Sequence, residues 1–179
     1  MKRLGVLMGV LGLTLLAGTL EAQRAPLRAR GYLGVGGGLG VPSGQFGNDA
    51  NLGWIGHAFA GYTSRGGLWG GRIDASLGRN PLGTPGGFWI GGATANLVVT
   101  PGKRPASFHP YFLAGFGAFH VNATGGSGET RAALNGGAGL QLHLGHQSDL
   151  FIEGRFLTIR ATRAVNMIPI TLGFRWGGI

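Results

Sequence analysis

The stretch Ile168-Pro-Ile-Thr-Leu-Gly-Phe-Arg-Trp176 alternates between large apolar residues and smaller or polar ones. Successive side chains of an extended strand point to opposite faces, so this alternation predicts a strand with one apolar face. In a soluble protein, that face packs into the core. In a transmembrane barrel it meets lipid, and the other face, with Arg175, points into the lumen. The apolar face consists of Ile168, Ile170, Leu172, Phe174 and Trp176.

The first residues of the chain are typical of a secretory signal peptide. Lys2 and Arg3 precede an apolar run over residues 4–17, which is too short and too glycine-rich to be a good spanning helix. We predict export through the secretory pathway and cleavage after Ala22, although an N-terminal membrane anchor is the alternative. The predicted domains are the signal peptide, residues 1–22, and one outer-membrane barrel domain, residues 23–179, with no further domain after the last strand.

Composition favours an exported all-β protein. The chain has 179 residues, of which 39 are glycine and none is cysteine. This glycine share is about three times the usual one, and helices tolerate glycine poorly. The formal net charge is +9. In an exported chain we expect this charge to meet peptidoglycan or the lipopolysaccharide phosphates of the outer-membrane lipid rather than nucleic acid, although a basic surface that only contacts water is the alternative.

Segments of alternating pattern continue along the chain, separated by clusters of Gly, Pro, Asn, Asp and Ser that favour turns. Short connections between neighbours are typical of an antiparallel meander. We therefore predict an all-β fold, an eight-stranded antiparallel up-and-down transmembrane β-barrel, with both chain ends on the periplasmic side. The predicted strands are residues 30–41, 52–62, 68–78, 87–100, 110–122, 131–144, 149–160 and 168–176.

Large aromatic residues fall near the ends of these strands. If the first strand runs away from the periplasm, one outward-facing group lies at the periplasmic ends and another at the opposite ends. Two such belts are expected where amphipathic rings meet the two headgroup layers of a membrane. The predicted periplasmic belt consists of Tyr62, Trp69, Tyr111 and Trp176, and the opposite belt of Trp54, Trp89 and Phe119.

Charged residues of three predicted strands share the inward phase. An eight-stranded barrel is filled by side chains rather than by an open channel, and charges buried there need partners. We predict a mutual ion-pair network that plugs the lumen, with glycines of the first strand making room for the arginines. A gated polar path and a catalytic acid are the functional alternatives. The predicted network consists of Arg72, Asp74, Glu153, Arg155 and Arg175.

The sequence carries no convincing catalytic, cofactor or metal site. Glycines within residues 31–40 do not complete a Gly-x-Gly-x-x-Gly motif before a helix, which argues against nucleotide binding. His143 and His146 are close in sequence at a strand end, and the other histidines are isolated, so we expect no metal. Ser76 and Asp74 share a face, but a catalytic triad built on them depends on the cross-strand position of a histidine.

Four parts of the chain resemble the small bacterial outer-membrane β-barrel family represented by the OmpA transmembrane domain and its OmpX-like relatives. They are the signal peptide and residues 111–119, 151–156 and 168–176. The last stretch resembles the C-terminal β-signal of such proteins, with Trp176 as the aromatic residue, although three residues follow it. The resemblance implies a monomer in the Gram-negative outer membrane, assembled by the barrel-assembly machinery through its last strand.

The resemblance says more about architecture than about activity. We predict a non-enzymatic, porin-like integral outer-membrane barrel with a plugged polar lumen, without cofactors, that contributes to envelope integrity or surface interaction. One alternative is a soluble periplasmic binder of small ligands, similar to lipocalins or avidin, which would combine the same strand count with an apolar interior. Another alternative is a lipid-A-modifying barrel enzyme, because such enzymes share the fold and the location.

Overall fold

The structure, a computed structural model, describes residues 30–83, 86–101, 108–145, 148–161 and 164–177. The predicted signal peptide and its cleavage site lie outside these residues. Within the described ranges, no helix is long and apolar enough to cross a membrane. Most of the described chain is β-strand, in agreement with its glycine-rich composition.

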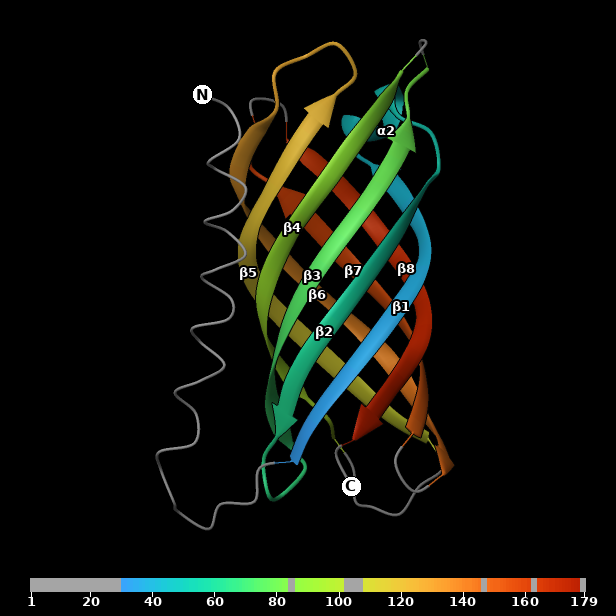
Figure 1. Cartoon of the computed structure of the whole chain (residues 1–179), viewed down its shortest axis with the longest axis vertical. Coiled ribbons are helices and arrows are strands. Elements are labelled where there is room, and N and C mark those ends of the chain that lie inside the picture. Colours follow the sequence, from blue (N-terminus) through green and yellow to red (C-terminus); the bar gives the residue numbers. More distant parts are fainter. Residues whose placement is uncertain (1–29, 84–85, 102–107, 146–147, 162–163, 178–179) are drawn as a thin grey trace, which may run out of the picture.

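The strands close into an eight-stranded antiparallel barrel, which confirms the predicted fold (Figure 1). Each strand pairs with the next one along the chain, and β8 pairs with β1 to complete the circle. Closure leaves no unpaired strand edge. The strands are β1 (Arg30–Ser43), β2 (Gly53–Thr63), β3 (Trp69–Pro81), β4 (Gly87–Val99), β5 (Phe108–Ala123), β6 (Glu129–Gly145), β7 (Ser148–Ile159) and β8 (Val165–Gly177).

The two ends of the barrel differ in what they carry (Figure 1). The start of β1 and the end of β8 lie side by side, since Tyr32 pairs with Gly177; we call this the terminal end. The opposite end, the loop end, carries the short helix α2 (Phe46–Asp49) between β1 and β2. The end of β3 and the start of β4 lie at the loop end too, as do the corresponding ends of β5 and β6 and of β7 and β8. Because the number of strands is even, β1 begins and β8 finishes at the same end of the barrel.

Large apolar side chains cover the outside of the barrel. In every strand except β5, the residues that the sequence predicted to face lipid point outward; in β2 this prediction rested on Trp54 and Tyr62. The predicted apolar row of β8 is exposed along its length, and Leu172 near its centre is 55% exposed. An exterior of this kind suits lipid rather than water. Other exposed apolar residues are Leu33, Val35, Ile73, Leu97, Leu140, Ile152 and Phe156.

The predicted phase of β5 is wrong. Tyr111 and Phe119, which were expected to face lipid in the two belts, point into the lumen and are 1% and 2% exposed. Both faces of β5 carry large apolar residues, including the outward-facing Phe116, so alternation alone could not distinguish them. The space inside the barrel does distinguish the two faces. The Tyr111 ring covers Gly139 of β6, where a Cβ atom would lie 2.4 Å from that ring.

The other aromatic residues predicted for the belts do face outward. Trp54 and Trp89 lie at the loop end, with ring centroids 6.0 Å apart. Tyr62 and Trp69 lie at the terminal end, with centroids 6.2 Å apart. Trp176 of β8 lies at the terminal end as well. The exterior therefore keeps an aromatic group at each end without Tyr111 and Phe119.

The lumen is divided into zones along the barrel axis. Charged side chains occupy its middle. Toward the terminal end lie two small groups of buried residues, one of Tyr32, Phe59 and Phe151 and the other of Val98, Tyr111 and Leu113. Toward the loop end lies a larger apolar cluster of Phe46, Ala50, Ile55, Ile90, Phe119, Val121, Ala133, Leu157, Ile159, Val165 and Met167.

Glycines of β1 make room for aromatic rings and not, as predicted, for arginines. A Cβ atom at Gly34 would lie 2.3 Å from the Phe59 ring, and one at Gly36 would lie 2.8 Å from the Phe151 ring. Phe59 in turn supports a charged residue, because the Arg72 guanidinium carbon lies 4.6 Å from its ring centroid. The first strand thus shapes the charged zone through the rings that cover its glycines.

We predict that Leu172→Arg destabilises the barrel by about 2–4 kcal/mol, because a cation on the lipid face near the bilayer midplane loses hydration. Leu172→Phe should be tolerated, since it keeps the face apolar. Unfolding by urea in lipid vesicles measures both variants. Equal stability of the Arg and Phe variants would show that this face does not meet lipid.

Candidate functional site

Four charged side chains form a closed ring of ion pairs in the middle of the lumen. The Arg72 guanidinium donates to Glu153 Oε2 at 2.7 Å and to Asp74 Oδ2 at 3.1 Å. The Arg155 guanidinium donates to Asp74 Oδ1 at 2.6 Å and also contacts Glu153 Oε1. Each arginine therefore bonds both carboxylates. We call these four residues the charge ring; its formal charges cancel.

The charge ring crosses the whole lumen. It joins β3 to β7, which are separated by three strands on either side of the closed barrel and so lie on opposite walls. Both strands run in the same direction, because every neighbouring pair is antiparallel. β3 carries its arginine before its carboxylate, at Arg72 and Asp74, whereas β7 carries Glu153 before Arg155. This opposite order places unlike charges face to face across the lumen.

Neutral groups complete the hydrogen bonding of the charge ring. The Tyr111 hydroxyl donates to Glu153 Oε2 at 2.8 Å. The Asn96 side-chain amide donates to Asp74 Oδ2 at 2.7 Å and to the Thr94 hydroxyl at 3.0 Å. Such satisfaction of lone pairs is what makes a buried ion-pair cluster tolerable. Charge-ring partners thus come from β4 and β5 as well as β3 and β7.

Arg175, the fifth residue of the predicted network, does not join the charge ring. Its guanidinium bonds Asp149 Oδ2 through Nη2 at 2.5 Å and through Nε at 2.8 Å, and stacks 4.8 Å from the Tyr32 ring centroid. His143 Nδ1 lies 2.7 Å from the other oxygen of Asp149. These residues form a second, smaller cluster near the terminal end. Arg175 is too far along β8 to reach the middle zone.

A catalytic triad built on Ser76 and Asp74 requires a histidine beside them on a neighbouring strand. His57 of β2 lies directly opposite Ser76 of β3. However, His57 Nε2 has no hydrogen-bond partner, and Asp74 is engaged by both arginines of the charge ring. His57 and Ser76 help to line a cavity in the lumen, together with residues of β4 to β8, and this cavity has a volume of about 20 Å³. That space suits a single water molecule rather than a substrate.

The described residues contain no group of three His, Asp or Glu side chains placed to hold a metal ion. His143 lies beside the carboxylate of Asp149. His146 lies outside the residues that the structure describes.

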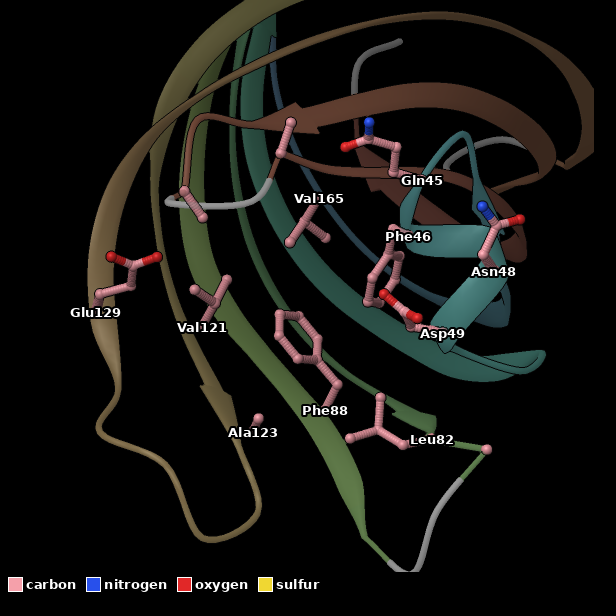
Figure 2. A pocket seen from close by; sticks show the side chains of 13 residues that line it. Gln45, Phe46, Asn48, Asp49, Leu82, Phe88, Val121, Ala123, Glu129 and Val165 are labelled. Carbon is pink, nitrogen blue, oxygen red and sulfur yellow. The ribbon is translucent and has the colours of Figure 1, made fainter.

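A larger pocket, with a volume of about 900 Å³, opens at the loop end of the barrel (Figure 2). We call it the loop-end pocket. Its walls come from α2 and from β4, β5 and β8, and the apolar cluster of the lumen lies beneath it. Phe46 and Phe88 lie together in it, with ring centroids 5.0 Å apart. The other apolar lining residues include Leu82, Val121, Ala123 and Val165.

Polar side chains line the rim of the loop-end pocket. Figure 2 shows Asp49 of α2 and Glu129 of β6 on opposite sides of it. Glu129 also bonds the exposed Arg131, with Nη2 and Oε2 2.7 Å apart. Among the described lining residues there is no lysine, arginine or histidine. The described part of the lining therefore combines apolar walls with polar side chains at the rim, two of which are carboxylates.

Sequence analysis missed three features of these sites. Asp149 belongs to the same inward phase as Glu153 and Arg155, so the alternation of β7 could have found it. Tyr111 was missed as a partner of Glu153 because the phase of β5 was reversed. The loop-end pocket depends on how α2 packs against the barrel mouth, for which the sequence carries no periodic signal.

No family model matches the sequence, and the search of curated proteins found no match. Solved structures do match. The crystal structure of Neisserial surface protein A (NspA) has a TM-score of 0.66 at 17% identity, covering 82% of this chain and 96% of NspA. The fold is that of the small outer-membrane β-barrels.

Two further structures share this fold. Ail, the attachment invasion locus protein of Yersinia pestis, has a TM-score of 0.54 at 16% identity, covering 83% of this chain and 98% of Ail. The N-terminal β-barrel domain of Pseudomonas aeruginosa OprF has a TM-score of 0.51 at 11% identity, covering 84% of this chain and 98% of that domain. The likeness confirms the resemblance to small outer-membrane barrels at the level of the fold.

We predict that Glu153→Gln destabilises the barrel by about 3–5 kcal/mol, because it leaves two buried arginines with one carboxylate. The matched control is Glu129→Gln, which removes an ion pair whose arginine side chain is 48% exposed. That change should cost about 0–1 kcal/mol. Urea unfolding in lipid vesicles measures both. Equal losses would show that the charge ring contributes no more than a surface pair.

Proposed function

We propose that this chain is a non-enzymatic integral outer-membrane protein whose lumen is plugged by the charge ring, and that it contributes to envelope integrity or surface interaction. The observation that carries this proposal is the placement of apolar side chains outside and buried ion pairs inside. A soluble lipocalin-like or avidin-like binder needs the reverse arrangement. Exposed apolar patches of this extent are rare on soluble monomers.

The aromatic residues at the two ends support a membrane location. At the loop end, Arg79 of β3 lies opposite both Trp54 and Trp89, and its guanidinium carbon is 5.4 Å from the Trp89 ring centroid. A cation beside rings at a headgroup layer is well placed to meet lipid phosphates. We propose lipopolysaccharide as the lipid partner at this end.

The charge ring supports a closed lumen. Its ion pairs join opposite walls, and the buried rings of Phe59 and Phe151 lie beside it. Above it, the apolar cluster occupies the loop-end part of the barrel. A hydrated ion would have to separate the ion pairs to pass. We therefore propose a structural plug rather than a gated path.

The net charge of this chain and its structural likeness to Ail support a role in surface interaction. Ail has been crystallised with the heparin analogue sucrose octasulfate, and its structure has also been determined in a phospholipid bilayer nanodisc. This chain shares the fold and carries a formal net charge of +9. By analogy, we propose that its surface meets anionic groups of the envelope.

Assembly and export complete the proposal. Residues 1–22 would direct export, and residues 23–179 would form the mature barrel. The apolar row of β8, which ends at Trp176, would act as the β-signal for the barrel-assembly machinery before β8 pairs with β1. Closure of the barrel leaves no strand edge for another copy, which favours a monomer. The small size of the cavity that His57 and Ser76 help to line does not favour a lipid-A-modifying enzyme.

We expect the full chain, expressed in a Gram-negative host, to fractionate with the outer membrane and to require detergent for extraction. Its mobility in a detergent gel should differ between heated and unheated samples, because a closed barrel resists unfolding without heat. Recovery as a soluble periplasmic protein after signal cleavage would overturn the membrane assignment.

We expect the purified barrel to give no sustained ion conductance in planar lipid bilayers, because the charge ring closes the lumen. An open porin inserted under the same conditions is the control. Stable single-channel steps that scale with the amount of this protein would argue for a conducting lumen.

A further inference from the structure

The small cavity in the lumen lies where the charged zone meets the apolar zone. Arg155 of the charge ring lines it, and so do Ile55, Phe119 and Leu157 of the apolar cluster. Its volume is about 20 Å³. One water molecule needs at least about 10–15 Å³ of such space. The cavity is therefore large enough for a single small molecule of that size.

Two polar side chains that line this cavity have atoms without a hydrogen-bond partner among the described residues. These atoms are Nε2 of His57 and both the amide nitrogen and the amide oxygen of Asn135. Each of the two residues is only 8% exposed. Buried polar groups in folded proteins are nearly always paired, either with protein atoms or with an ordered water molecule. The three unpaired atoms therefore indicate a bound partner inside the lumen.

His57 and Asn135 come from opposite walls of the barrel. Their strands, β2 and β6, are separated by three strands on either side of the closed sheet. The hydroxyl groups of Ser76, Thr94 and Thr171 line the same cavity and offer further donors and acceptors. A partner held there would link β2 to β6, as the charge ring links β3 to β7.

The charges around the cavity favour water over an ion. Arg155 already bonds Asp74 and Glu153, so the formal charges of the charge ring cancel. A bare ion of either sign would lose its hydration here without meeting an unpaired counter-charge. Water needs no counter-charge, and it can both donate to and accept from the amide of Asn135.

We propose that this cavity is a binding site for one internal water molecule, held between His57 of β2 and Asn135 of β6. The water supplies the hydrogen bonds that these two side chains lack, and the site excludes free ions. The interior then contains a hydrated layer between the charge ring and the apolar cluster. This inference concerns the inside of the barrel and does not depend on the proposed envelope role.

Nuclear Overhauser effects between water and methyl protons test the proposal. The barrel is placed in lipid nanodiscs with its isoleucine and leucine methyl groups isotopically labelled. Ile55 and Leu157, which line the cavity, should show cross-peaks at the water frequency. Ile159 and Leu113 are buried but do not line the cavity, and they should show none. Adding potassium chloride should change neither set of signals.

Variants separate a bound water from proton exchange at hydroxyl groups. Asn135→Leu removes the amide and fills the cavity, so the cross-peaks of Ile55 should disappear. Ser76→Ala is the matched control, because it removes an exchangeable hydroxyl from the same cavity but keeps Asn135, and it should retain them. His57→Phe tests the other wall with a ring of similar size and should weaken them. Unfolding by urea checks that each variant forms a stable barrel.

The proposal is overturned if Ile55 and Leu157 show no cross-peaks with water in the unaltered barrel, which would mean that the cavity is dry. It is overturned as well if the cross-peaks persist in Asn135→Leu and disappear in Ser76→Ala, because exchange at the hydroxyl would then explain them. Methyl shifts of Ile55 and Leu157 that saturate with potassium chloride would show an ion in place of water and would also overturn it.

Discussion

The interior of this barrel depends on the pairing of charges between β3 and β7. A charge in a narrow lumen has little water around it, so it is stable only when opposite charges meet it at close range. Arg72 and Asp74 on one wall face Glu153 and Arg155 on the other in reversed order, which satisfies both carboxylates at once. Because these strands lie on opposite walls, the same contacts that neutralise the charges also span the lumen.

The other buried residues of the lumen lie on the two sides of the charge ring. On one side Tyr111 and Phe59 bring aromatic surface to the charge ring, and each ring fits because a glycine faces it. On the loop-end side of the charge ring, the lumen holds the large apolar cluster. Where that apolar zone reaches the barrel mouth, α2 covers only part of it. The loop-end pocket is the space left between the helix and the strand ends.

The exterior obeys a different constraint, which is contact with lipid along the strands and with headgroups at their ends. Aromatic pairs mark both ends, Trp54 with Trp89 and Tyr62 with Trp69. Likeness to NspA extends over most of both chains at 17% identity. Such divergence is possible because a barrel of this type requires alternation, closure and a neutralised lumen rather than particular residues at most positions. The fold alone therefore does not define a function, which has to be argued from particular sites.

The sequence by itself determined the strand number, the antiparallel order and the facing of seven strands. In six of them polar and apolar residues alternate, and in β2 the facing came from Trp54 and Tyr62. It also identified the four residues of the charge ring, since charges stand out on an inward face. Only the tertiary structure decided the facing of β5, where Tyr111 and Phe116 lie on opposite faces that both carry large apolar residues, and packing against Gly139 selects one. It likewise decided that Arg175 bonds Asp149, and that His57 faces Ser76, because cross-strand register depends on the closed barrel. The pocket beside α2 arises in the same way, from segments distant in sequence that meet only in the folded barrel.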